Sequence, residues 1–302
     1  MKAFSTIRSY GRKFKSNNAI WSMLEEFMMK KYLQIMSGKS VEIASIIFAI
    51  LVWQLLADYI VQNKFYLPSF TDMTYAFIGT ISKNTELELF GLDYQLPVLL
   101  VDLIYSLMYF WIGILAALLI GIPLGMIMGW FRTLDRIVDP LIEIVRPIPP
   151  LAWIPFAIIW IGLNPIAAGF LIFIGAVFPI VINTFTGFKN VSRVYVEAAK
   201  VLGCNTNREL IQYVALPSAL PSIAAGIRIA MGVGWMCLVA AEMFGIGRNG
   251  LGYKIWHHYY LHNMDLVLVY MFILGFLGLF IDRTLRHYID SKLLKWREGL
   301  VI

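Results

Sequence analysis

Four ionisable residues lie within or beside strongly apolar stretches, where a charge requires a partner, water or a function. Glu143 and Arg146 are three residues apart, so a helix would place them on one face, where they would pair. Arg228 and Glu242 flank another apolar run, and a charge buried in a membrane span costs roughly 2.5 to 3.5 kcal/mol unless it is paired or reaches the interface. We expect these four residues to line a transport pathway or gate. Interfacial anchoring is the alternative for Arg228 and Glu242.

The segment after Glu242 contains four glycines, Gly245, Gly247, Gly250 and Gly252, and superficially resembles a phosphate-binding loop. No strand is expected before it, and G-x-x-x-x-G-K-[ST] occurs nowhere in the chain, which argues against a P-loop nucleotide site. We therefore expect no cofactor on this chain. A flexible or re-entrant loop explains the glycines better.

Three histidines follow this loop, at positions 257, 258 and 262. His258 and His262 could share a helix face as metal ligands with Asp265 nearby, but the surrounding Trp and Tyr residues favour an aromatic belt at the membrane interface. The chain contains neither H-E-x-x-H nor G-x-S-x-G. We expect no metal site, no catalytic residue and no enzymatic activity of the chain itself.

Gly121, Gly125 and Gly129 recur every four residues, so one face of their helix has almost no side chains. Such a groove admits another backbone, either from the same chain or from a second subunit. The alternative is that glycine is simply common in membrane helices.

The composition predicts what kind of structure holds the residues discussed above. Of the 302 residues, 59% are apolar and only 15% are charged, and the mean hydropathy is +0.72. Only a bilayer accepts so much outward apolar surface, so the sequence predicts an all-α integral membrane protein that crosses the membrane several times. Secreted and cytosolic proteins are excluded, and the two cysteines lack the spacing of a disulfide framework or a metal site.

Charge-free stretches predict about six membrane-spanning helices. The clearest is the run of twenty-nine residues between Asp102 and Arg132. The forty-two residues 147–188 are too many for one crossing, and the turn-like residues 162–165 divide them into two spans, the first beginning near Ile137. The remaining spans are expected around residues 43–57, 229–241 and 266–281.

Nineteen of the twenty-five lysines and arginines fall on one side of this topology when both termini are placed in the cytosol. Residues 1–40 then form a cytosolic segment in which apolar residues at helical spacing predict an amphipathic helix on membrane lipid. A solvated helix is the alternative. Residues 41–302 form the six-helix domain, with an external loop at 63–96 that contains a short helix capped by Ser69 or Thr71.

The polar interruption at 188–220, between the fourth and fifth spans, is the most informative segment. It contains Glu197, Ala198, Ala199 and Gly203, followed by Leu216-Pro217. It resembles the EAA loop of permease subunits of binding-protein-dependent ABC importers. The resemblance implies the type I importer permease fold, and it implies that these four residues dock on a cytosolic ATPase that binds ATP and Mg2+.

Further strings in the same order are similar to the nitrate, sulfonate, taurine and bicarbonate branch of that family. These strings are Leu67-Pro68-Ser69, Gly121 to Gly125, Arg146 to Pro149, Leu216 to Pro221, Ala240 to Met243 and Trp296 to Gly299. The branch implies import of a small oxyanion through two permease copies, expected to be a homodimer, with an external solute-binding protein. Net charge of +6 is explained by topology, so no nucleic-acid partner is expected.

Two alternatives to anion import remain open. One is import of a vitamin precursor by the same family. The other is a secondary transporter driven by an ion gradient, which would predict paired intramembrane carboxylates or inverted repeats; the sequence reveals neither.

Overall fold

The computed structural model describes residues 40–89, 92–247, 249–289 and 291. The predicted amphipathic helix before residue 40 and the Trp296 to Gly299 string lie outside them. The chain divides into two compact units, Met1–Asn63 and Lys64–Ile302. In the first, one helix spans Ser40–Val61 and ends in a π-helical turn, η1, at Leu56–Val61.

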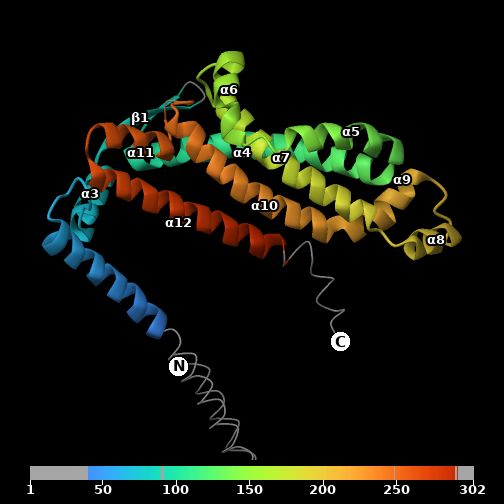
Figure 1. Cartoon of the computed structure of the whole chain (residues 1–302), viewed down its shortest axis with the longest axis horizontal. Helices are drawn as coiled ribbons and strands as arrows, with labels where there is room; N and C mark the ends of the chain where they lie inside the picture. Colours follow the sequence, from blue (N-terminus) through green and yellow to red (C-terminus); the bar gives the residue numbers. More distant parts are fainter. Residues whose placement is uncertain (1–39, 90–91, 248, 290, 292–302) are drawn as a thin grey trace, which may run out of the picture. The chain divides into compact units, whose positions relative to one another are not determined.

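The second unit is a helical bundle with one small hairpin (Figure 1). Its long apolar helices are α4 (Val98–Trp130), α7 (Pro165–Lys189), α10 (Leu216–Met243) and α12 (Met264–Tyr288). Its shorter elements are α3 (Phe70–Ser82), β1 (Asn84–Leu89), β2 (Leu92–Pro97), α5 (Arg132–Val145), η2 (Pro150–Trp153), α6 (Ile154–Ile161), α8 (Arg193–Val201), α9 (Asn207–Leu210), η3 (Ile211–Ala215) and α11 (Leu251–Tyr260).

Five helices in the described part of the chain are long and apolar enough to cross a membrane, at Ser40–Val61, Val98–Trp130, Pro165–Lys189, Asn207–Met243 and Met264–Tyr288. A sixth crossing is possible only if α5 and the helical segment Pro150–Ile161 count as one, because they meet at an angle of 86°. The span predicted to begin near Ile137 is therefore sharply bent. Three prolines between 147 and 150 explain the break, since proline lacks the amide hydrogen that a helix requires.

The core lies where α7 packs against both α4 and α10. Phe110, Ile172 and Leu238, one from each helix, are completely buried there. Glycines allow the close approach: a Cβ on Gly125 would lie 2.6 Å from the Val181 carbonyl oxygen, and one on Gly175 would lie 2.5 Å from the Cys237 sulfur. The helices therefore meet backbone to backbone rather than through interlocking side chains.

The segment predicted as a loop at 63–96 is more ordered than expected. Ser69 caps α3 in a reciprocal capping box with Asp72, as the sequence indicated, but the helix continues to Ser82. The strands β1 and β2 then pair antiparallel, with Asn84 opposite Pro97. This hairpin was missed and makes the protein mostly rather than entirely helical. The hairpin leads directly into α4. The Val98 amide, at the start of α4, donates to the carbonyl of Lys83, the residue before β1, at 2.9 Å.

Candidate functional site

The predicted coupling residues lie on α8 and the turn after it, at the end of the second unit remote from α3 and α11 (Figure 1). Glu197 and Ala198 are exposed, whereas Ala199 is buried. The helix also presents apolar side chains to its surroundings, since Val201 and Leu202 are 88% and 86% exposed. A nine-residue helix with an acidic group beside uncovered apolar residues has the chemistry of a docking surface.

Gly203 ends this helix in a left-handed conformation, with φ of +100°. The turn is closed by hydrogen bonds from the Gly203 amide to the Lys200 carbonyl and from the Cys204 amide to the Ala199 carbonyl. Nothing lies within 4 Å of a Cβ built on Gly203. The glycine is therefore required by backbone conformation and not by crowding within the chain. The next helix, α9, begins at a capping box of Thr206 and Glu209.

The predicted packing stripe on α4 faces α7. Cβ atoms on Gly121 and Gly129 would lie 2.9 Å from Ile180 Cγ2 and 2.5 Å from Phe188 Cβ. The sequence left open whether the groove receives the same chain or a second subunit. In the structure α7 of the same chain fills it, and Gly113 continues the stripe toward the start of α4.

The four pathway candidates are not brought together. Glu143 and Arg146 are both exposed, and no ion pair joins them within the described residues, so the predicted pair is absent. Arg146 caps α5 where the helix breaks at the following prolines, which removes the regular geometry that the pairing required. Arg228 is half-buried in the middle of α10.

Glu242 is completely buried and holds the glycine-rich loop in place. The Ser106 hydroxyl donates to its Oε1 at 2.6 Å, and the Gly252 amide donates to its Oε2 at 2.7 Å. Ser106 in turn accepts from the Leu251 amide at 2.9 Å. A Cβ on Gly250 would collide with the Glu242 carboxylate. The glycines thus admit a backbone around a carboxylate of the chain itself.

A second buried carboxylate, Asp102 on α4, was missed. It is 2% exposed, accepts from the Tyr270 hydroxyl at 2.9 Å and lies 3.8 Å from the Lys254 ammonium. In the sequence Asp102 merely marked the edge of an apolar run. Both carboxylates lie where α11 packs against the bundle, and each is held by its own donors.

We expect Glu242→Gln to lower the free energy of unfolding by about 1–3 kcal/mol, because an amide accepts through one oxygen and leaves a buried donor unsatisfied. Thermal unfolding in detergent measures this. Glu143→Gln is the matched control, since Glu143 is exposed and should change stability by less than about 0.5 kcal/mol. Equal melting of the two variants would contradict an anchoring role for Glu242.

The chain is similar in sequence to known membrane proteins. Residues 121–294 match the family described as binding-protein-dependent transport system inner membrane component. A protein of Methanocaldococcus jannaschii, provisionally named an ABC transporter permease protein, is 40% identical over 83% of this chain and 89% of its own length. The bicarbonate transport system permease protein CmpB of Synechococcus elongatus is 34% identical over 84% of this chain and 90% of its own.

Two further similarities were found. The taurine transport system permease protein TauC of Escherichia coli is 36% identical over 63% of this chain and 68% of its own. Among solved structures, a chain of the MetNI methionine ABC transporter in an inward-facing conformation is 22% identical, with a TM-score of 0.48, and covers 62% of this chain and 96% of that one.

The long apolar helices define an integral membrane protein. The chain belongs to the family of inner membrane components of binding-protein-dependent transport systems, the permeases of ABC importers. It is a multi-pass inner-membrane protein and is not itself an enzyme.

Proposed function

We propose that this chain forms the membrane pathway of an ATP-driven importer for a small oxyanion and that α8 docks on a cytosolic ABC ATPase. The observation that carries the docking proposal is the uncovered surface of α8, where exposed Glu197 lies beside apolar Val201 and Leu202. ATP and Mg2+ would bind to the ATPase. Closure of that partner would move α8, and through α9 it would bias the position of α10, which follows in the chain.

The orientation we propose places α8 and both termini in the cytosol. Nineteen of the twenty-five basic residues support it, because lysine and arginine accumulate on the cytosolic side of membrane proteins. The hairpin and α11 would then lie at the external face, where a solute-binding protein delivers its ligand. A second permease copy, in a homodimer, would complete the pathway, with lipid around it and no nucleic-acid partner.

An oxyanion is proposed as the solute because named relatives carry bicarbonate and taurine, the second of which bears a sulfonate. Nitrate is a further candidate of the same chemistry. Arg228 is the cation within α10 that could face such a solute. A vitamin precursor would not need this charge.

We expect Arg228→Gln to reduce bicarbonate uptake by about tenfold, because a charged hydrogen bond to the anion is lost. Uptake of labelled bicarbonate into proteoliposomes that contain the whole complex measures this. Arg136→Gln, which removes an exposed arginine on α5, is the control. Unchanged uptake and unchanged anion preference in Arg228→Gln would exclude the contact.

Withdrawal of ATP tests the proposed energy source. In the same proteoliposomes, ATP is removed while a potassium gradient with valinomycin holds the membrane potential. An ABC importer stops, whereas a secondary transporter continues. The buried Asp102 and Glu242 make this test necessary, because intramembrane carboxylates also serve ion-coupled transport.

A further inference from the structure

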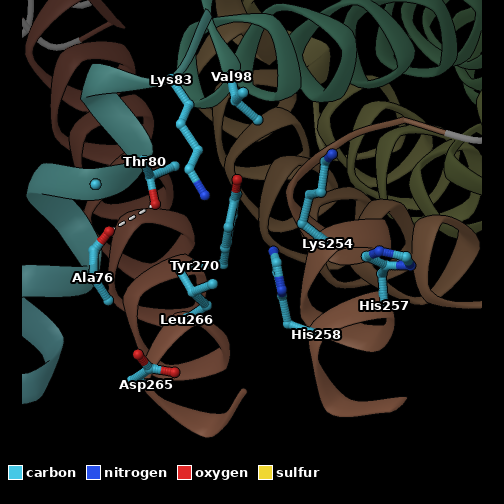
Figure 2. A pocket seen from close by; sticks show the side chains of 11 residues that line it. Ala76, Thr80, Lys83, Val98, Lys254, His257, His258, Asp265, Leu266 and Tyr270 are labelled. Carbon is cyan, nitrogen blue, oxygen red and sulfur yellow. Dashed lines mark hydrogen bonds between the residues drawn. The ribbon is translucent and has the colours of Figure 1, made fainter. Parts of the chain in front are cut away.

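A cavity of about 280 Å3 lies between α3, the start of α4, α11 and α12, at the end of the bundle away from α8 (Figures 1 and 2). None of the pathway or coupling residues line it. Its polar wall is formed by Lys83, Lys254, His257, His258 and Asp265. The end of α3, α11 and α12 bring these residues together, so the cavity is a product of the tertiary fold.

Lys83 supplies the least compensated positive charge of the cavity. Its backbone is fixed, because its carbonyl accepts from the Val98 amide at 2.9 Å. Its side chain extends toward the space between Thr80 and Tyr270 in Figure 2. Among the side chains that the structure describes, no carboxylate forms an ion pair with it. A ligand with negative charge would neutralise this ammonium group.

Lys254 adds a second ammonium group that its neighbours only partly neutralise. Its Nζ lies 3.8 Å from Asp102 Oδ1, which is too far for a hydrogen bond, so its N–H donors stay available to a ligand. The other oxygen of Asp102 accepts from the Tyr270 hydroxyl. Asp265 is the carboxylate in the lining itself, and it lies at the end of the view opposite Lys83 (Figure 2). The lysine side of the cavity therefore attracts an anion.

His258 presents an unsatisfied nitrogen between the two lysines. Its ring stacks on Tyr270 with centroids 5.7 Å apart, and its buried Nδ1 has no hydrogen-bond partner among the described residues. Burial, His257 and the two lysines lower the pKa of His258 to about 4, against an opposing effect of Asp265. The ring is therefore neutral at pH 7, and one nitrogen carries a proton that can be donated to an oxygen.

Thr80 offers no hydrogen-bond donor to a ligand in the cavity. Its hydroxyl donates to the Ala76 carbonyl at 2.8 Å, so its proton is already used. The Thr80 oxygen can therefore only accept a further hydrogen bond, and the donors for an anion must come from Lys83, Lys254 and His258.

We propose that this cavity binds an oxyanion group, held by Lys83, Lys254 and Nδ1 of His258. The group is either a free oxyanion from the surrounding water or the phosphate of a phospholipid headgroup, since both present the same oxygens. The site is separate from the proposed pathway and does not require ATP or the binding protein.

Sulfate binding to the purified full-length chain in dodecyl maltoside, which contains no phosphate, tests the proposal by calorimetry. Lys83→Gln should raise the dissociation constant about tenfold, and Lys83→Arg should keep it within about twofold. His258→Phe keeps the ring on Tyr270 but removes Nδ1, and should also weaken binding. Lys189→Gln on α7, a lysine outside the cavity lining, is the control. Thermal unfolding checks that each variant is folded.

Native mass spectrometry of the same proteins with added phosphatidylglycerol distinguishes the two sources. Sulfate binding that Lys83→Gln weakens supports a free oxyanion site. Retention of a phosphatidylglycerol molecule that Lys83→Gln loses, without sulfate binding, supports a headgroup site. If the wild type binds neither, or if folded Lys83→Gln binds both as well as the wild type, the proposal is wrong.

Discussion

Replacing Gly203 with arginine is expected to weaken ATPase association severely. The expected loss of binding free energy is about 2 kcal/mol or more, which is roughly a thirtyfold loss of affinity. The residue has φ of +100°, so any other side chain strains the turn after α8. The added arginine would also project into the surface on which the ATPase is proposed to dock. Association is measured with the purified ATPase, and transport with proteoliposomes.

Gly245→Arg provides a closely matched control for this experiment. Gly245 follows α10 at the other end of the bundle, has φ of +77° and, like Gly203, has nothing within 4 Å of a Cβ. Both variants therefore suffer backbone strain without internal collision. If Gly203→Arg and Gly245→Arg retain ATPase association equally, α8 is not the docking element.

The second large effect is expected at Gly125, where α4 and α7 make backbone contact. A valine there would place its Cβ 2.6 Å from the Val181 carbonyl oxygen and 2.7 Å from Thr184 Cβ, and neither neighbour is the end of a flexible side chain. We expect about 3 kcal/mol of destabilisation, because the two helices must separate to admit the side chain. The amount of folded protein after detergent extraction and its thermal unfolding measure the effect.

The same substitution at Gly275 separates packing from helix propensity. Gly275 lies within α12, is exposed and has nothing within 4 Å of a Cβ. Valine is a somewhat better helix former than glycine, so Gly275→Val should leave stability unchanged or slightly raise it. Similar melting of Gly125→Val and Gly275→Val would show that the α4–α7 contact is looser than the structure places it.

Several features could be predicted because their signals are local in the chain. The membrane character follows from long charge-free runs, and a helix cap at Ser69 or Thr71 follows from the type of these residues just after Pro68; the structure uses Ser69. The coupling segment was recognisable because a polar loop with Glu197, two alanines and Gly203 interrupts those runs. In each case the decisive residues are close neighbours along the sequence.

The break after Arg146 shows where local signals became ambiguous. The apolar pattern predicted a span that begins near Ile137, whereas the prolines between 147 and 150 argued for an interruption within it. Backbone hydrogen bonding prevailed, and α5 meets the following helical segment at 86°. The hairpin, in contrast, has a local signal that the prediction of a loop passed over. Apolar residues alternate at Leu87 and Leu89 in β1 and at Leu92, Tyr94 and Leu96 in β2, which is the period of a strand.

The sequence by itself determined the class of protein and the apolar helices, and it located the loop that we propose for coupling, because these depend on composition and short-range spacing. Only the tertiary structure decided what the buried polar groups do. Glu242 binds Ser106, which is 136 residues away in the chain, and Asp102 binds Tyr270, which is 168 residues away. A carboxylate in an apolar run has the same sequence signature whether it lines a pathway or anchors a loop. The difference lies in which donors the fold brings to it, and that depends on helix packing across the whole chain.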